Sequence, residues 1–470
     1  MALDAVMLSR VQFGFSVSFH IIFPTISIGL ALFLALMEGQ WLRTRNELYL
    51  TIYKFWLNIF AMAFGVGVVT GIVLSFEFGT NFAYFAQKVG PVIGPLIGLE
   101  VLTSFFLEAG FLGIMLFGFN RVGPRLHFLA TCLVALGTIL SASWILSANS
   151  WMQTPDGVVL RDGHFEVMNW WRVIFNPSYP YRLAHMLIAA YLTVSFLVAG
   201  VGAYYVREGR HLVFARKTMS LGLTFATILV GAQVFLGDVL AGVVAEHQPA
   251  KLQAIEGNWE DQPRAPYQLI IVPDSAEARN HYTLGIPLLG SIMVTHSING
   301  AVPGLKRTAP RERPPMGPVF YAFRIMYLIG TGMFAIVCIA MWLRLRGRLY
   351  STRWFLSLLV GMAPAGLLAT LGGWYTAEIG RQPYVVFGLL RTADTVSPVG
   401  PKSVLVTLLA LAATYTLFMT GFLVLAGRAI RRGPSDEALT VSGSLKRGTM
   451  VVPGPPGLNA PPLPQSGAES

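Results

Sequence analysis

Nine long apolar runs, separated by more polar segments, dominate the sequence. Each run has about 20 residues or more, which is the length an α-helix needs to cross a bilayer core of about 30 Å. The pattern therefore predicts an all-α integral membrane protein with about nine transmembrane helices. The runs lie at residues 15–37, 52–76, 93–118, 127–148, 183–206, 217–243, 318–343, 354–373 and 403–427.

The segments between the runs alternate in length and charge. Every segment after an odd-numbered run is short and basic, whereas the segments after even-numbered runs are longer. Because short basic loops stay in the cytoplasm, the pattern predicts an N-terminus outside and a C-terminus inside. The basic residues concerned are Arg43, Arg45, Arg121, Arg125, Arg207, Arg210, Arg216, Lys217, Arg344, Arg346, Arg348, Arg353, Arg428, Arg431 and Arg432.

The segment 245–316 is far larger than a helix connection requires and is rich in Pro, Arg and Glu. Such a loop, carrying Trp259, Tyr267 and Tyr282, is typical of a lid or a binding segment. The predicted division of the chain is six transmembrane helices in 1–244, an external loop in 245–316, three transmembrane helices in 317–430 and a Pro/Gly/Ser-rich, disordered cytoplasmic tail in 431–470.

The composition agrees with a membrane protein. Hydrophobic residues make up 54% of the 470 residues and charged residues only 12%, about half the share of a soluble domain. The net charge of +11 comes from basic residues beside apolar runs, so no nucleic-acid partner is predicted. Cys132 and Cys338 lie inside apolar runs without a partner at metal-ligand spacing, which argues against a disulfide framework or a cysteine-bound metal.

Four potential metal ligands lie at similar depths, near the outer face, in or beside four different predicted helices. His20, His185 and Met326 lie in the outer parts of their helices, and Glu378 follows the end of the eighth run. Each alone is as often a packing or hydrogen-bonding residue, but their shared depth indicates a metal site. A His/Met pair favours a six-coordinate, electron-transferring haem, whereas a carboxylate or a single histidine leaves a position open for oxygen chemistry.

Two carboxylates lie inside the third run. Glu100, Ser104 and Glu108 fall within about 80° of one another on an ideal helix, so they share one face. Buried carboxylates interleaved with hydroxyls suit proton relay through water, and two buried glutamates are too costly for a packing role alone. Interhelical hydrogen bonding remains the alternative for the neighbouring hydroxyl groups. Further polar residues in adjacent runs are Ser141, Ser143, Ser147 and Asp238.

Six motifs, in order along residues 4–430, make the chain resemble subunit I of the cytochrome bd-type quinol oxidases. The most specific is the Gly-Arg-Gln-Pro segment that follows the eighth run. The motifs are Ser18-Phe-His-Ile-Ile-Phe-Pro24, Phe78-Gly-Thr-Asn81, Phe105-Phe-Leu-Glu108, Ala148-Asn-Ser-Trp-Met-Gln153, Phe323-Arg-Ile-Met326 and Gly373-Trp-Tyr-Thr-Ala-Glu-Ile-Gly-Arg-Gln-Pro383.

The resemblance implies three haems in a protein of the bacterial inner membrane. His185 and Met326 would be the axial ligands of haem b558. His20 and Glu378 would be ligands of the high-spin haems b595 and d. The resemblance leaves open which residue serves which haem. Further residues implied by the resemblance are Arg324 and Arg381, as counter-charges to haem carboxylates, and Trp374, in the path of electrons between haems.

The resemblance also implies substrates and partners. Lys251-Leu-Gln-Ala-Ile-Glu256 is similar to the quinol-contacting segment of the family, with Lys251 and Glu256 binding ubiquinol or menaquinol. The other substrate would be O2. A second multi-span subunit, of the subunit II type, and a small single-span subunit are the expected protein partners.

The chain departs from the family pattern in its short external loop and at two residues. The short loop resembles that of the cyanide-insensitive type, in which a b-type haem can replace haem d. Many relatives have Glu where this chain has Ser75 and Gln where it has Glu77, so the polar surroundings of the high-spin haems are expected to differ.

The predicted mechanism is vectorial. Quinol would release its protons outside, and the protons for water would come from the cytoplasm along Glu108 and Glu100, generating a proton motive force without a pump. His20 and Glu378, with these two glutamates, are the predicted catalytic residues. The main alternative is a di-haem b-type subunit that exchanges electrons with quinone and does not touch O2, and a second is a proton-coupled transporter.

Overall fold

The computed structural model describes residues 4–434, and within them nine helical segments are long and apolar enough to span a membrane. Each predicted run coincides with one of these segments. The spanning helices are α1 (Ala5–Thr44), α2 (Glu47–Thr80), α3 (Ala83–Leu99) with η1 (Glu100–Phe105) and α4 (Phe106–Phe117), α5 (Pro124–Gln153), α7 (Tyr179–Glu208), α8 (Leu212–His247), α11 (Met316–Leu345), α12 (Arg353–Gly361) with α13 (Ala365–Ile379), and α14 (Pro401–Arg432).

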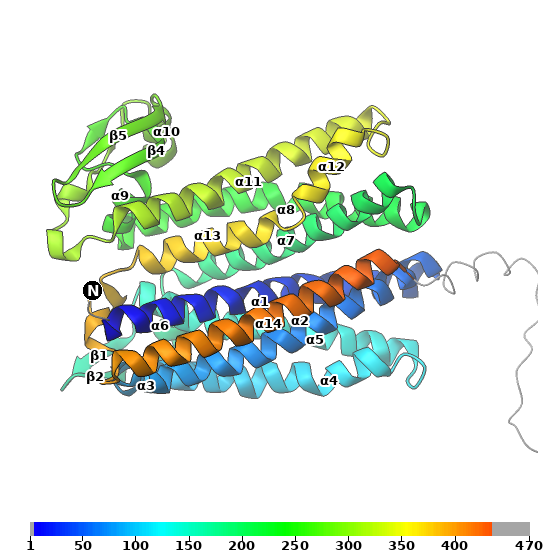
Figure 1. The fold of residues 1–470 in the computed structure, drawn as a ribbon, viewed down its shortest axis with the longest axis horizontal. Helices are drawn as coiled ribbons and strands as arrows, with labels where there is room; N and C mark the ends of the chain where they lie inside the picture. The colour runs from blue at the N-terminus through cyan, green and yellow to red at the C-terminus, as the bar shows by residue number, and fades with distance from the viewer. Residues whose placement is uncertain (1–3, 435–470) are drawn as a thin grey trace, which may run out of the picture.

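The spanning helices form two bundles that lie side by side (Figure 1). In the first bundle, α1 packs on α2 and α5, and α5 packs on α3 and α4. In the second bundle, α7 packs on α8 and α13, and α11 packs on α8 and α13, so these four helices close a ring. Contacts of α1 with α7 and α13 join the bundles, and α14 packs against α1 and α2.

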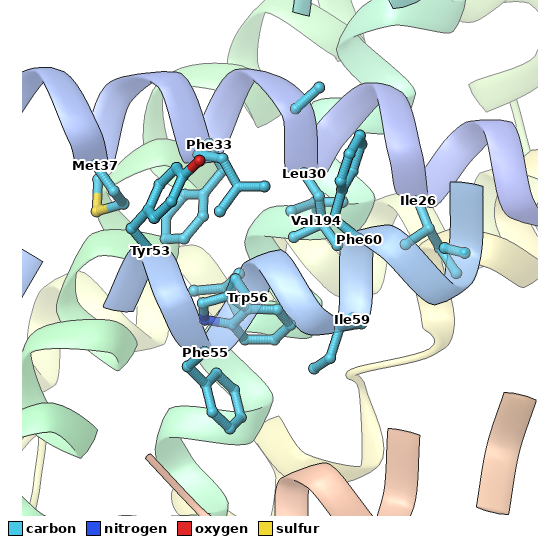
Figure 2. Close-up of a cluster of buried hydrophobic side chains, with 14 of the residues drawn as sticks. Ile26, Leu30, Phe33, Met37, Tyr53, Phe55, Trp56, Ile59, Phe60 and Val194 are labelled. Atoms are coloured by element: carbon cyan, nitrogen blue, oxygen red, sulfur yellow. The ribbon is translucent and has the colours of Figure 1, made fainter. Parts of the chain in front are cut away.

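An apolar core lies where the two bundles meet (Figure 2). Leu30 of α1 and Phe60 of α2 are fully buried in this core, next to Val194 of α7. A Cβ at Gly29 would lie 2.4 Å from Val194 Cγ2 and 2.6 Å from the carbonyl oxygen of Ala190. Glycine at this position therefore allows α1 and α7 to approach closely, as small residues do between transmembrane helices.

Local capping chemistry fixes the starts of α1, α2 and α5. The Asp4 carboxylate accepts the backbone N–H of Val6 at 3.0 Å, and Asn46 accepts that of Leu48 at 3.0 Å. Pro124 begins α5, where its missing N–H leaves no hydrogen bond unmade. These polar ends extend the helices beyond the apolar runs that predicted them.

Two predicted helices are interrupted in the structure. The third span contains the π-helical segment η1, which begins at Glu100, and the eighth span is divided between α12 and α13 by a turn at residues 362–364. Pro364 explains the second break because it cannot continue a helix from the preceding turn. The prediction that Glu378 follows the eighth helix is wrong: α13 continues through Trp374 to Ile379, although the residues there are less apolar.

The small elements outside the spans gather at the end of the molecule that carries the N-terminus (Figure 1), which we call the hairpin end. There β1 (Val158–Arg161) pairs with β2 (His164–Val167), followed by α6 (Trp170–Ile174). The chain after α13 contributes β7 (Tyr384–Val386), β8 (Leu390–Arg391) and η4 (Thr392–Asp394).

The segment predicted as an external loop is largely structured and lies at the hairpin end. A hairpin of two eight-residue strands, β4 and β5, is its largest element. Of the predicted tail 431–470, the first two residues belong to α14, and 435–470 lie outside the described residues. The elements of the loop are α9 (Pro249–Glu256), β3 (Gln262–Pro263), β4 (Tyr267–Asp274), β5 (Arg279–Ile286), α10 (Leu289–Thr295), β6 (Ala301–Val302), η2 (Leu305–Arg307) and η3 (Pro310–Glu312).

Candidate functional site

The second bundle contains His185 on α7 and Met326 on α11. His185 Nε2 lies 3.2 Å from Gln233 Nε2 of α8, and His185 Nδ1 is buried without a hydrogen-bond partner among residues 4–434. Glycines face both side chains: a Cβ at Gly237 would lie 3.7 Å from His185 Cε1, and a Cβ at Gly373 only 2.8 Å from Met326 Sδ. A buried imidazole with an unused nitrogen, and a thioether that requires glycine beside it, would both suit ligation of a haem iron.

His20 of α1 is oriented by α2. Its Nδ1 lies 2.9 Å from Thr70 Oγ1, which itself donates to the carbonyl oxygen of Val66 at 2.9 Å. Thr70 therefore orients the His20 ring through Nδ1. His20 Nε2 makes no hydrogen bond within residues 4–434, and an imidazole nitrogen held in this way suits a metal ligand. A Cβ at Gly71 would lie 3.2 Å from His20 Cε1, so glycine gives the ring its space.

Glu378 lies near the end of α13 and is held by α5. Its Oε1 accepts hydrogen bonds from Asn149 Nδ2 at 2.9 Å and Gln153 Nε2 at 3.1 Å, and its Oε2 accepts one from Arg381. The α1 helix lies alongside, since Ser18 Oγ is 2.6 Å from the hydroxyl of Tyr375. His20 and Glu378 are therefore on neighbouring helices, and the half-buried Trp374 precedes Glu378 by one turn.

Buried cations surround this carboxylate. Arg182 Nη2 donates to Asn149 Oδ1 at 2.7 Å, while its Nε is buried and unpaired within the described part of the chain. Arg381 is 5% exposed, and two of its nitrogens have no partner in residues 4–434. Burial lowers the pKa of Arg381, with Glu378 opposing that shift. Since a buried charge needs a partner, these guanidinium groups fit an anion such as the carboxylates of a haem.

Arg324 of α11 is the other arginine that the resemblance implies as a counter-charge to haem carboxylates. It is 2% exposed, stacks 4.1 Å from the ring centroid of Tyr267, and donates from Nε to the carbonyl oxygen of Gln268 at 2.5 Å. Its nearest charge is Glu256, at 3.9 Å, and both Nη atoms lack a hydrogen bond to the described residues. Arg324 therefore fixes the loop on α11 and retains donors for an anion.

Lys251 and Glu256 lie on the same short helix, α9, but face different partners. Lys251 Nζ donates to Gln153 Oε1 at 2.6 Å and to Gln248 Oε1 at 2.5 Å, and Glu256 faces Arg324. Burial, reinforced by Arg182 and Arg381 and opposed by Glu378, lowers the pKa of Lys251 well below its ordinary value. Burial also raises the pKa of Glu256, with Arg324 opposing.

The two glutamates of the third span both contact α5. Glu100 Oε1 accepts a hydrogen bond from Ser141 at 2.7 Å, and a Cβ at Gly137 would lie 2.5 Å from Glu108 Cγ. Gly137 and Ser141 are one turn apart, so the two side chains contact α5 at points about 6 Å apart along its axis. The extra residue of η1 changes the face expected for a regular helix, yet both glutamates remain against α5. Glu108 Oε1 is buried without a partner in residues 4–434, as expected of a group that binds water or a mobile proton.

The neighbouring polar residues, for which interhelical hydrogen bonding was the alternative to relay, make other contacts. Ser143 and Ser147 donate to the carbonyl oxygens of Ile139 and Ile174, which is a structural use. Asp238 lies 3.3 Å from His296, and both side chains are more than half exposed. Asp238 therefore contacts the external loop at His296, and its part in proton relay stays a prediction.

The first bundle contains a buried hydrogen-bond network that was not predicted from the sequence. Glu38 Oε1 lies 2.6 Å from His127 Nδ1, and Glu38 Oε2 accepts the hydroxyl of Thr131 at 2.5 Å. His127 Nε2 lies 3.2 Å from the carbonyl oxygen of Met115. The signal was present, because Glu38 follows one apolar run directly and His127 begins another.

Ser75 and Glu77, the two departures from the family pattern, differ in environment. Ser75 Oγ bonds to the carbonyl oxygen of Gly71 in its own helix, at 3.1 Å. Glu77 is 3% exposed and accepts a hydrogen bond from Ser16, one turn from His20 on α1. Glu77 therefore belongs to the polar surroundings of His20.

Comparison with known proteins decides among the predicted functions. The model of the family "Cytochrome bd terminal oxidase subunit I" matches residues 8–434. The chain belongs to this family. The resemblance predicted from the sequence is thus confirmed, and with it a multi-pass protein of the bacterial inner membrane that uses haem cofactors and is part of a terminal oxidase.

Individual members of the family are similar over nearly the whole chain. Subunit 1 of the cytochrome bd-II ubiquinol oxidase of Escherichia coli is 31% identical, covering 92% of this chain and 97% of that protein. Subunit 1 of the cytochrome bd ubiquinol oxidase of Bacillus subtilis is 34% identical, covering 93% and 95%. The bd oxidase structure from Geobacillus thermodenitrificans matches with a TM-score of 0.85 and 31% identity, covering 92% of this chain and 99% of that one.

Proposed function

We propose that this cytochrome bd subunit I oxidises quinol at the hairpin end and supports the reduction of O2 to water at a separate site beside His20 and Glu378. That the chain is a terminal quinol oxidase subunit follows from its family and its relatives, and the di-haem alternative is not favoured. Two distinct donor sets carry the mechanistic part of the proposal. His185 and Met326 offer a pair of ligands, whereas His20 offers one nitrogen, Nε2, because its Nδ1 contacts Thr70.

Three haems fit these donors. We assign His185 and Met326 to haem b558, and His20 and Glu378 to haems b595 and d, or to a b-type haem in place of d. Bound haem supplies the electron transfer and the O2 chemistry that amino-acid side chains lack. Arg324 and Arg381 retain unpaired nitrogens, within residues 4–434, that could bind haem carboxylates. Thr70 orients the His20 ring through Nδ1 and leaves Nε2 to ligate iron.

Quinol oxidation needs a group that takes up protons at the outer face. Glu256 is suited to this role, because a carboxylate accepts the proton of a quinol hydroxyl and Arg324 stabilises its charged form. Lys251 holds α9 against α5 and α13. The names of relatives include both ubiquinol and menaquinol oxidases, and either quinol would fit this role.

Water formation consumes protons, which we assign to the inner side. Glu108 and Glu100 lie one after the other against α5, and Ser141 bonds to the second of them. With quinol protons leaving at the hairpin end and substrate protons entering from the other end, the reaction separates charge without a pump. The subunit acts with a partner subunit, which we expect to be multi-span, and with a small single-span subunit.

A carbon monoxide difference spectrum tests the proposed function. The reduced, purified oxidase is expected to show a low-spin haem that ignores carbon monoxide and a high-spin haem that binds it. His20→Ala is expected to remove or shift the carbon monoxide signal while the low-spin signal stays. A preparation with no haem that reacts with carbon monoxide would contradict the proposal. It would favour the alternative of a di-haem b-type subunit that does not react with O2.

The pH dependence tests the role of Glu256. Only its ionised form accepts a quinol proton, so the rate of quinol oxidation is expected to rise with pH as Glu256 ionises. Because burial raises the pKa of Glu256, this rise should occur at higher pH than for an ordinary glutamate. Glu256→Gln is expected to lower the rate about 100-fold and to abolish the rise.

The exposed Glu260, in the same loop, provides the matched control. Glu260→Gln should keep both the rate and the pH profile. A Glu256→Gln variant with the wild-type pH profile would remove Glu256 from the reaction.

A further inference from the structure

Gln153, the last residue of α5, lies between the external loop and the Glu378 site and is 1% exposed. Its side-chain oxygen accepts a hydrogen bond from Lys251 Nζ at 2.6 Å. Its side-chain nitrogen donates to Glu378 Oε1 at 3.1 Å and to the carbonyl oxygen of Ala377 at 3.3 Å. Its backbone carbonyl accepts from Gln248 Nε2 at 3.0 Å. One residue thus joins α5, α9 and α13.

The chemistry of the neighbours fixes the direction of this amide. An ionised carboxylate can only accept hydrogen bonds, whereas the amine of Lys251 has N–H groups to donate whether or not it is charged. The oxygen of Gln153 must therefore face Lys251, and its NH2 group must face Glu378. Asn149, one turn earlier on α5, donates to the same oxygen of Glu378 at 2.9 Å. Two amides on one face of α5 hold this carboxylate, and one of them is itself held by the loop.

Lys251 of α9 also makes a close contact with the chain directly after α13, at Gly380. A Cβ at Gly380 would lie 2.7 Å from Lys251 Cγ and 3.0 Å from Lys251 Cε. The stem of Lys251 therefore packs on the backbone two residues after Glu378. If α9 moved away, Gln153 would lose its cation and Glu378 would lose part of the support for one of its two donors from α5.

We infer that Gln153 is a positioning residue that couples the seating of the loop helix α9 to the placement of the Glu378 carboxylate. The inference rests on the proposed function, because it links the quinol side of the protein to the Glu378 site. Coupling of this kind is reciprocal: a ligand that moves α9 changes the Glu378 site, and a ligand at the Glu378 site changes the affinity of the loop.

Two substitutions at Gln153 separate its two bonds. Gln153→Leu loses both, so α9 should exchange its backbone amide hydrogens about 10-fold faster, and the carbon monoxide difference spectrum of the assembled oxidase should shift. Gln153→Glu keeps an acceptor for Lys251 but loses the donor to Glu378. This variant should retain slow exchange in 249–256 and still show the spectral shift. A purely structural role would move both readouts together.

Lys251→Met provides the reciprocal test, because it keeps the side-chain stem against Gly380 and removes the ammonium group. It should shift the same spectrum, and the Lys251→Met/Gln153→Leu double variant should shift it no further than Gln153→Leu alone. Tyr205→Phe is the control for losing a buried hydrogen bond between helices, since the Tyr205 hydroxyl donates to the carbonyl oxygen of Ile430, at the opposite end of α7 from His185. It should leave both readouts unchanged.

Additive spectral shifts in the double variant, or slow exchange of α9 in Gln153→Leu, would overturn the coupling. Failure of the proposed function looks different, since the wild-type oxidase would then lack a haem that binds carbon monoxide. Hydrogen exchange of α9 needs no haem signal, so it still decides whether Gln153 seats the loop.

Discussion

Met326→Leu is expected to abolish the low-spin haem spectrum and to reduce quinol oxidation by about 100-fold or more, while the haem that binds carbon monoxide remains. Leucine fills nearly the same volume but has no sulfur lone pair, so the iron at His185 would lose one of its two axial ligands. Changes to residues that merely support a ligand already cost about 10- to 100-fold. The fold should persist because Met326 lies between helices that other contacts hold together.

Reduced-minus-oxidised spectra with and without carbon monoxide measure both haem classes in one preparation. Met341→Leu is the matched control, since Met341 is on the same helix and is 38% exposed. It should leave the spectra and the rate unchanged. A Met326→Leu oxidase that retains the wild-type low-spin spectrum would show that another residue supplies the ligand.

The membrane architecture was predictable because one physical requirement dominates it. A helix in lipid must satisfy its backbone internally and present about 20 apolar residues, and this leaves a signal in each run. The positions of His20 and Met326 within their helices followed from the same runs. Pro364 marked the second break, since a proline cannot continue a helix from the preceding turn, whereas the break at Glu100 left no such signal because it depends on the helices packed around it.

The network around the site was beyond the sequence for a different reason. Gln153 and Lys251 are 98 positions apart, and Glu38 and His127 are 89 apart, so no local spacing reports their contacts. Lys251 and Glu256 are close in sequence, yet α9 turns them toward different helices. The motif that contains Asn149 and Gln153 supported the family resemblance without revealing that these amides hold Glu378.

Glu108→Gln is expected to lower O2 consumption about 100-fold with all haem spectra intact. Glutamine matches glutamate in size and polarity but cannot take up and release a proton, and loss of a proton-transfer group costs about 100- to 10,000-fold. Glu108 contacts Gly137 of α5 through its Cγ atom. Because glutamine keeps this atom, the substitution should not disturb the packing of the two helices. Glu108→Asp should recover part of the rate, because the carboxyl group returns at a shorter reach.

The decisive measurement is the rate of electron delivery in the same variant. If Glu108 carries protons for water, the haems of Glu108→Gln should become reduced by quinol at the normal rate and then fail to turn over. Proteoliposomes should develop a membrane potential in proportion to the residual O2 consumption, because charge separation and proton uptake are one process. Glu246→Gln, at an exposed residue near the hairpin end of α8, should behave as wild type. Normal turnover in Glu108→Gln would mean that protons reach the site by a path that avoids the third span, and the vectorial route along α5 would have to be abandoned.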